Sequence, residues 1–181
     1  MADASRLHLL AMRTLFAALC LFVIFWRILP LSTVPRGWAG PDLIAALSFA
    51  WVLRRPEYAP ALLIAAVVLL ADLMFQRPPG LWAALVVLGC EALKSRAPGL
   101  RDRAFGAEWL AVAMVVAAII VGYRLTLAVL VVPQAPLGLS LMQMAMTVLC
   151  YPLVVMASAF IFGVRKAKPG ESVAGSRRFG T

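Results

Sequence analysis

The stretch from Gly40 to Leu93 constrains the fold most, because two proline-containing joints divide it into three short apolar runs. The first run, 43–53, and the third, 80–93, are shorter than the roughly 20 apolar residues that a helix needs to cross about 30 Å of hydrocarbon. At about 1.5 Å per residue, the first run covers only about 16 Å. Flanking residues, a locally thinned bilayer or surrounding protein must complete its path. We therefore expect a compact, irregular helical core.

The composition is that of an integral membrane protein. Hydrophobic residues make up 64% of the 181 residues and charged residues 14%, whereas soluble domains are about 45 to 50% apolar and about 25% charged. The apolar runs leave almost no length for an appended soluble catalytic domain. The net charge of +9 does not indicate nucleic-acid binding here, because Lys and Arg stand at the ends of apolar runs, where they orient the chain in the membrane.

The order of the apolar runs predicts one membrane domain, an all-α compact bundle of six transmembrane helices over residues 1–164. Its helices are expected at 9–29, 42–53, 59–75, 80–93, 107–132 and 137–164. The basic segment 165–181 has few apolar residues, which predicts a disordered cytoplasmic tail. Cys20, Cys90 and Cys150 all lie inside apolar runs and are expected to be buried small hydrophobes.

Two topologies agree equally well with the charges. Six crossings with both termini in the cytoplasm leave outside only four of the 17 Lys and Arg residues, namely Arg27, Arg36, Arg77 and Arg124. This bias follows the positive-inside rule. If 43–53 is instead re-entrant and the N-terminus lies outside, four basic residues again remain outside. The charges alone leave both topologies open, including whether 42–53 fully crosses the membrane.

Local signals fix the ends of the second helix. Pro41 and Asp42 indicate its start, because proline there needs no hydrogen-bond donor and a carboxylate is favourable near the positive end of a helix. Pro56 indicates its end, because proline disfavours a helical conformation at the preceding residue.

Charged residues inside the apolar runs are the next candidates for a site, because ionisable groups in hydrocarbon are costly and usually have a specific role. Asp72 and Arg124 both fall in the outer half of the bilayer in the six-crossing topology. We hypothesise a buried ion pair between them, which would join the third and fifth helices; the alternative is that each reaches the interface separately. Glu91 lies three residues before Lys94, which predicts a salt bridge on one helix. Glu108 suits a helix N-terminus.

The sequence offers no arrangement of residues for catalysis, and we expect neither an enzyme nor a cofactor or metal site. It has no histidine inside an apolar run, no paired carboxylates on one helix face and no Gly-rich phosphate loop. The spacing of the cysteines matches neither a zinc nor a redox motif.

A pattern of nine residues runs through the central stretch. It consists of Pro41 and Asp42, then Trp51 with Arg54, Arg55 and Pro56, then Asp72 followed by Pro79 and Gly80. In order and spacing it resembles the rod shape-determining protein MreD family, over residues 40–93. The chain departs from the family pattern at Ala71, where the family often has glycine, and at Pro79–Gly80, which replace Pro-Leu-Gly.

The resemblance implies a non-enzymatic subunit of the bacterial inner membrane that helps the cell-elongation (rod) complex to organise lateral peptidoglycan synthesis and rod shape. The expected partner is MreC, with MreB, RodA and a class B penicillin-binding transpeptidase, besides membrane lipid. The family is also similar in fold to the substrate-binding subunits of energy-coupling-factor transporters, in which six helices surround a cavity. That similarity favours the six-crossing topology.

Within this interpretation, Trp38, Arg77 and Trp82 are expected to rim the outer side of the cavity and to bind MreC. The alternative is that the tryptophans are interfacial belt residues.

On the inner side, Trp51, Arg54 and Arg55 could hold a cytoplasmic partner or anionic lipid. The alternative function is a substrate-binding membrane subunit of an energy-coupling-factor type vitamin or small-solute transporter. Such a subunit needs several polar side chains around its ligand, and the outer loops offer few.

Overall fold

The computed structural model describes residues 2–29, 38–101 and 104–164, and in these ranges the chain forms six α-helices and no strand. The helices are α1 (Ala2–Ile28), α2 (Leu43–Arg54), α3 (Ala61–Met74), α4 (Leu81–Arg101), α5 (Phe105–Val129) and α6 (Leu137–Ile161). The predicted all-α class and the number of helices are confirmed for the described residues. The tail predicted to be disordered, 165–181, lies outside them.

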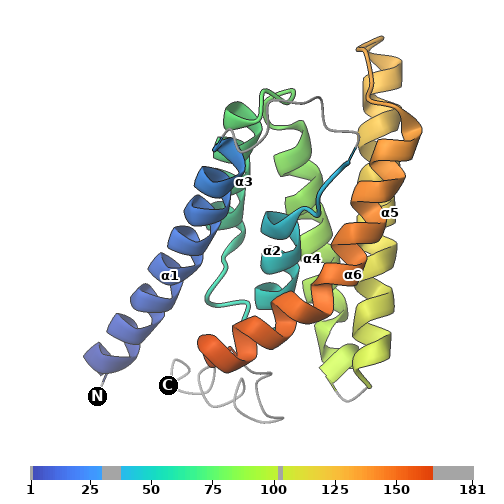
Figure 1. Ribbon diagram of the computed structural model, residues 1–181. Coiled ribbons are helices and arrows are strands. Elements are labelled where there is room, and N and C mark those ends of the chain that lie inside the picture. Colours follow the sequence, from blue (N-terminus) through green and yellow to red (C-terminus); the bar gives the residue numbers. More distant parts are fainter. Residues whose placement is uncertain (1, 30–37, 102–103, 165–181) are drawn as a thin grey trace, which may run out of the picture.

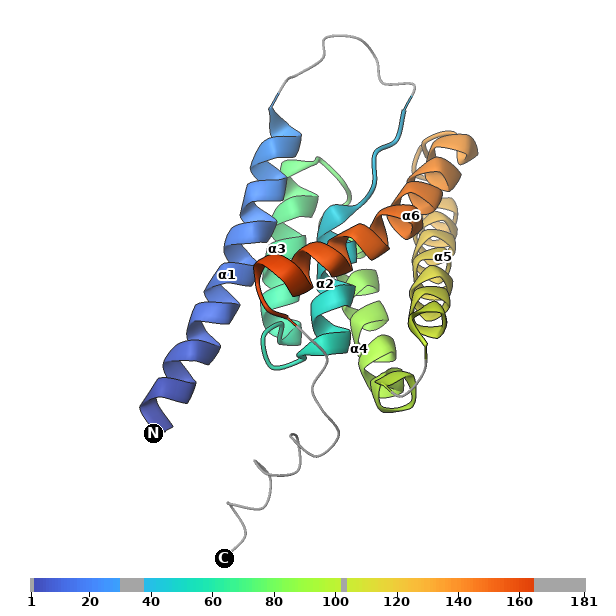
Figure 2. The ribbon, with the colours of Figure 1, turned by 60° about the horizontal axis from the view of Figure 1, so that its bottom comes forward.

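Helix α2 is the central element of the bundle (Figures 1 and 2). It is apolar on every side, and all of its residues from Ile44 to Arg54 are buried. A helix that is hydrophobic all round belongs in a core rather than at a surface. With 12 residues it is about 18 Å long, and the neighbouring helices shield all of it except Leu43, which is 36% exposed.

The other helices form an open ring around α2, in the order α1, α3, α4, α5 and α6. Each helix of this series packs against the next, and α1, α4 and α6 also pack against α2. Helices α1 and α6 have no contact as extensive as these, so the ring is open between them; Figure 2 shows α6 crossing α2 with its C-terminal end directed toward α1. We call the end at which α1 ends and α2 begins the upper end, as in Figure 1, and the opposite end the lower end.

Three helices of the described chain are long and apolar enough to cross a membrane: Arg6–Ile28 of α1, α5 and α6. Helices α2 and α3 are apolar but shorter. The many large apolar side chains on the outside of the bundle, such as Leu62, Leu88 and Phe160, are those expected of a surface that faces lipid. These helices and this surface are those of a membrane protein.

The lower end of α4 differs from the prediction. We expected the helix to end at residue 93 and a polar joint to follow, but α4 continues to Arg101. Lys, Arg and Ala are good helix formers, so a charged sequence does not by itself end a helix. The salt bridge expected between Glu91 and Lys94 is present, at 3.3 Å.

A turn at the upper end joins α3 to α4. Gln76 and Gly80 both have positive φ in this turn, 54° and 84°. Glycine adopts this conformation without steric cost, whereas a side chain does not. The path from α3 into α4 therefore depends on Gly80.

Replacing Gly80 by alanine is expected to destabilise the protein by about 1 to 2 kcal/mol, because a Cβ atom is strained at this φ. Thermal unfolding in detergent measures the effect. Gly138→Ala, in the first turn of α6, is the matched control, since its added Cβ meets nothing within 4 Å and alanine favours helix. Equal melting temperatures for the two variants would contradict the prediction.

Candidate functional site

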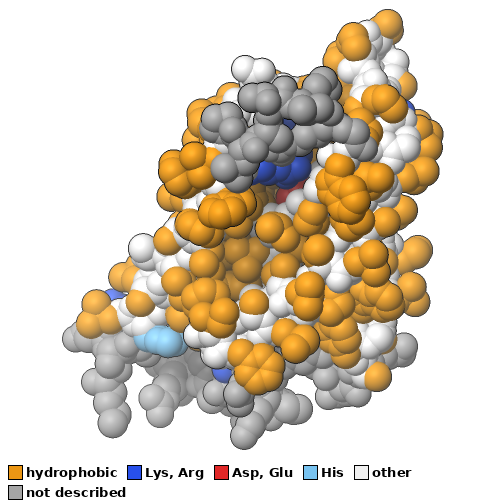
Figure 3. Space-filling view, in the orientation of Figure 1, with side chains coloured by type: hydrophobic (Ala, Val, Ile, Leu, Met, Phe, Trp, Pro, Cys, Tyr) orange, Lys and Arg blue, Asp and Glu red, His pale blue; other side chains and the backbone are white. Residues whose placement is uncertain are grey.

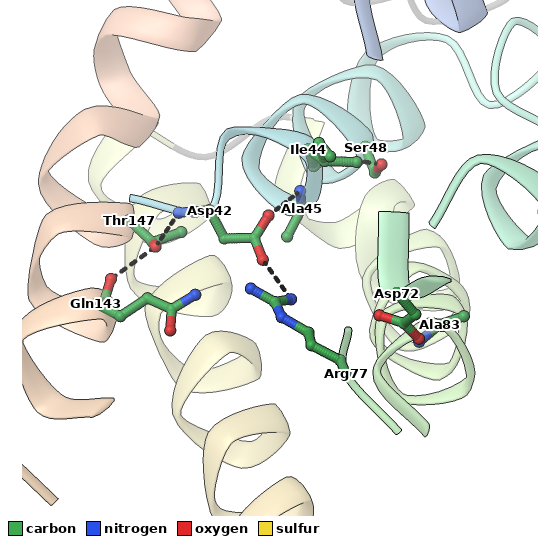
Figure 4. A network of polar contacts seen from close by, with 9 residues as sticks. All are labelled: Asp42, Ile44, Ala45, Ser48, Asp72, Arg77, Ala83, Gln143 and Thr147. Carbon is green, nitrogen blue, oxygen red and sulfur yellow. Dashed lines mark hydrogen bonds and ion pairs between the residues drawn. The ribbon is translucent and has the colours of Figure 1, made fainter. Parts of the chain in front are cut away.

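At the upper end of the bundle, Asp42 fixes the start of α2. Its Oδ1 accepts a hydrogen bond from the backbone N–H of Ala45 at 3.1 Å, which caps the helix. Its own backbone N–H donates to Oγ1 of Thr147 on α6 at 2.9 Å, and that hydroxyl donates to the carbonyl of Gln143 at 2.7 Å. Figure 4 shows this chain of contacts. The predicted helix start is therefore correct, and it also ties α2 to α6.

Arg77, from the turn between α3 and α4, reaches across the upper end to Asp42. Its Nη1 lies 3.5 Å from Oδ2 of Asp42 (Figure 4). The guanidinium group also lies over the ring of Trp82, 5.0 Å from the ring centre, and 5.5 Å from that of Phe75. An arginine above an aromatic face is attracted by the ring quadrupole. Arg77 thus joins the start of α2 to the start of α4.

Asp72 caps α4 rather than pairing with an arginine. Its side chain is fully buried, and Oδ2 accepts a hydrogen bond from the backbone N–H of Ala83 at 3.1 Å. The backbone N–H groups of a first helical turn have no partner within the helix and carry partial positive charge. The carboxylate of Asp72 satisfies one of them, and its Oδ1 has no hydrogen-bond partner.

The hypothesised ion pair between Asp72 and Arg124 is not formed, and that hypothesis was wrong. Arg124 Nη1 donates instead to the carbonyl of Ala135 at 3.0 Å and to Oγ of Ser140 at 2.9 Å. Arg124 therefore stabilises the hairpin between α5 and α6. Asp72 and Arg124 do not pair although they were expected at a similar depth. The first turn of α4 begins beside Asp72, and its backbone N–H of Ala83 donates a hydrogen bond to the carboxylate.

A second polar cluster lies at the lower end and is buried. Arg54 Nη1 and the hydroxyl of Tyr151 both donate to Oε1 of Glu108, each at 2.7 Å. The side chains of Arg54 and Glu108 are 6% and 1% exposed. Helices α2, α5 and α6 each contribute one member. This cluster fixes the lower end of α2 as Asp42 fixes the upper end.

Two of the three residues considered for a cytoplasmic partner or anionic lipid on this side are not accessible. Trp51 is fully buried and donates from Nε1 to Oγ of Ser158 at 3.2 Å, and Arg54 is buried in its ion pair. Arg55 remains partly exposed, 3.5 Å from Glu57. Trp51 and Arg54 are therefore parts of the core. Pro56 follows the end of α2, as its sequence signal predicted.

The three residues expected to bind a partner at the upper end differ in how far they are exposed. Trp82 is only 7% exposed and packs edge to face on Tyr123, with the ring centres 5.2 Å apart. Arg77 is engaged with Asp42 and Trp82, and its side chain is 20% exposed. Trp38 is 58% exposed. Trp38 is thus the most accessible of the three residues.

A lateral groove lies where the ring is open, with α1 and α6 as its walls and α2 as its floor. It consists of two hollows of about 300 and 160 Å³ that share Phe22, Val23 and Leu43. The remaining lining residues are Leu19, Trp26, Leu47, Val154, Ala157, Ser158 and Phe162. Figure 3 shows its apolar surface, with basic and acidic side chains near its upper end. The sequence analysis did not predict this groove.

A small cavity lies beside the upper polar cluster, between α2, α4, α5 and α6. Asp42, Gln143 and Thr147 line it together with apolar side chains, and Nε2 of Gln143 has no hydrogen-bond partner. The cavity has a volume of about 10 Å³, which is room for about one water molecule. Among the described residues, no group of three or more His, Cys, Asp or Glu side chains could hold a metal ion.

The lower cluster was missed because its members were assigned one at a time. Glu108 was assigned to a helix N-terminus, which is correct for its place in the first turn of α5. Arg54 was assigned to a partner or lipid. Arg54 and Glu108 carry opposite charges and both stand next to apolar runs on the same side of the membrane. Because buried charges need partners, this signal could have predicted that the two residues form a pair.

Comparison with protein-family models, curated proteins and solved structures finds no match for this chain. The functional interpretation therefore depends on the residues and on their geometry.

Replacing Arg54 by methionine is expected to cost about 3 to 5 kcal/mol, because it leaves the carboxylate of Glu108 buried without its cation. The double variant Arg54→Met, Glu108→Met should recover part of this loss. Lys94→Met is the control, since an exposed pair contributes only about 0 to 1 kcal/mol. Thermal unfolding in detergent compares them. Equal melting temperatures for Arg54→Met and Lys94→Met would contradict the buried role.

The capping role of Asp72 predicts that protein stability depends less on its negative charge than on the side-chain oxygen that accepts the hydrogen bond from Ala83. Asp72→Asn should retain most of the stability, whereas Asp72→Ala should lose about 0.5 to 2 kcal/mol, as for other helix caps. Exchanging the charges in Asp72→Arg, Arg124→Asp should not restore stability. If the exchanged pair were as stable as the parent protein, the two residues would be partners after all.

Proposed function

We propose that this chain is a non-enzymatic, MreD-like subunit of the bacterial cell-elongation complex. In this proposal it crosses the inner membrane six times, with both termini in the cytoplasm, and the lower end of the bundle faces the cytoplasm. Its direct partner is MreC, and through MreC it takes part in an assembly with MreB, RodA and a class B penicillin-binding transpeptidase. The resemblance of residues 40–93 to the MreD family supports this proposal.

The open ring supports a role in binding another membrane helix. Helices α1 and α6 both pack on α2, yet the lateral groove separates them beside the first turn of α2, at Leu43 and Leu47. A buried helix is normally surrounded on all sides, whereas the first residue of α2, Leu43, is 36% exposed and lines the groove with Leu47. This groove is the observation on which the partner proposal depends.

The chemistry of the groove suits an apolar transmembrane helix. Its lining is apolar except for Ser158, which already accepts the hydrogen bond from Trp51. Ala157 is a small residue on the α6 wall, and small residues let helix backbones approach closely in a membrane. We therefore propose that the transmembrane helix of MreC lies in the lateral groove. In this proposal Trp38, exposed at the upper end, contacts the segment that follows this helix.

The small cavity gives little support to the alternative, a subunit that binds a vitamin or small solute. Ligand pockets usually have about 300 to 1,000 Å³, and this cavity has about 10 Å³. Two of its polar groups, Asp42 and Thr147, are already bonded to each other and to their helices. A ligand of that class would have to open the bundle.

Filling the lateral groove tests the partner proposal. Ala157→Phe places a ring in the groove and should reduce MreC recovered by co-purification from native membranes by on the order of tenfold, the change for about 1.4 kcal/mol of lost binding. Met156→Phe, at the next position of α6, is the control: Met156 is 53% exposed and does not line the groove. Equal recovery of MreC with both variants would reject the groove as its binding site.

The parent protein provides the test of the function itself. Recovery of MreC with the parent protein, compared with an untagged membrane sample, would support membership in the elongation complex. Recovery of an ATPase pair with a membrane coupling subunit would instead support the transporter alternative.

A further inference from the structure

The two sides of the bundle have different hydrophobic lengths. Helix α3, with 14 residues, is about 21 Å long at 1.5 Å per residue, and the longer α1, which packs beside it, has its last turn level with the end of α3, where Arg27 lies over Phe75. Helices α5 and α6, with 25 residues each, are about 37 Å long. The hydrocarbon core of a bilayer is about 30 Å thick, so a flat bilayer cannot match both α3 and the α5–α6 hairpin.

The difference in length appears at the upper end. At the lower end, Arg54 in the last turn of α2 contacts Glu108 in the first turn of α5, so these helices are level there. At the upper end, Asp42 lines the same small cavity as Ile120, nine residues before α5 ends at Val129. The hairpin between α5 and α6 therefore extends about 14 Å beyond the start of α2. Figure 1 shows it above the other helices.

The tip of this hairpin is apolar and exposed. Val129, Leu130, Val131 and Leu137 are 81%, 61%, 88% and 57% exposed, and residues 125–164 contain no charged side chain. Burying one such side chain is favourable by about 1.5 to 3 kcal/mol relative to water. The tip is therefore more stable in hydrocarbon than in water.

Arg124, at the base of the hairpin, is compatible with a position in hydrocarbon. Its guanidinium group donates to Ala135 and Ser140, and Nε2 of Gln134 donates to the carbonyl of Arg124. A buried charge is tolerated when its donors are bonded within the protein. The two bonds to Ala135 and Ser140 satisfy Nη1 of Arg124 within the hairpin.

The opposite side has a polar boundary at a lower level. Arg27 at the end of α1 and Arg77 after α3 both lie over Phe75, 5.1 and 5.5 Å from the ring centre. Gln76 beside them is exposed. Basic side chains at helix ends favour contact with lipid headgroups and water.

We propose that this protein holds the upper leaflet of the bilayer in a step, thin beside α1 and α3 and thicker beside the α5–α6 hairpin. The surface partner is lipid: headgroups and water descend to the level of Arg77 on the short side, and acyl chains cover the hairpin on the long side. The shorter hydrophobic length of α3 drives the thinning. This inference needs no protein partner and stands apart from the proposed function.

Two cysteine substitutions at matched depth test the step. Asp72 of α3 contacts Ala83 of α4, and Tyr123 of α5 contacts the adjacent Trp82, so Asp72 and Tyr123 lie at a similar depth. Met74 and Leu125 each lie two residues further toward the upper end, and their depths therefore match as well. Met74 and Leu125 are 48% and 61% exposed. A flat bilayer would treat the two positions alike.

The experiment uses the full chain with the native cysteines Cys20, Cys90 and Cys150 replaced by alanine, in vesicles of phosphatidylethanolamine and phosphatidylglycerol. A water-soluble maleimide is present on both sides of the membrane. Met74→Cys should react faster than Leu125→Cys by on the order of tenfold, because the reactive thiolate does not form in hydrocarbon. Equal labelling of both variants in denaturing detergent controls for reactivity, and a shared melting temperature controls for folding.

Both alternative results would overturn the proposal. Fast labelling at both positions would mean a flat surface with the hairpin tip in water. Slow labelling at both positions would mean that hydrocarbon covers the short side as well.

Discussion

Helix α2 is buried from Ile44 to Arg54, and this is possible only because other helices satisfy the polar groups at both of its ends. At the upper end Asp42 caps the helix and its backbone N–H donates to Thr147; at the lower end Arg54 meets Glu108 and Tyr151. A backbone or guanidinium group left without partners in apolar surroundings costs several kcal/mol. The positions of α5 and α6 around α2 follow from these contacts, and the open side between α1 and α6 is the part of the ring that they do not close.

The residues that resemble the MreD pattern have structural roles in this chain. Asp42 and Asp72 cap α2 and α4, and Gly80 supplies the positive φ of the turn before α4. Trp51 packs in the core. Such residues support an inference about the fold more directly than one about a partner. The proposal for MreC therefore depends on the lateral groove, which none of the motif residues lines.

Local signals in the sequence predicted much of the fold. The apolar runs gave six helices, and Pro41, Asp42 and Pro56 gave both ends of α2. The partners of the charged residues could not be predicted in this way, because they depend on which helices are neighbours. Asp72 and Arg124 were matched by depth, yet a helix N-terminus lay closer to Asp72. The lateral groove left no signal either, since apolar residues face lipid and core alike in a membrane protein.

The pairing of Arg54 with Glu108 has a consequence for synthesis of the chain. The two residues are 54 positions apart, so the ribosome completes α2, α3 and α4 before Glu108 exists. During that interval α2 carries a cation that has no acidic partner within the apolar bundle. The final position of α2 must then wait for the second half of the chain. An incomplete chain consequently differs from a finished one by an uncompensated arginine among its membrane helices.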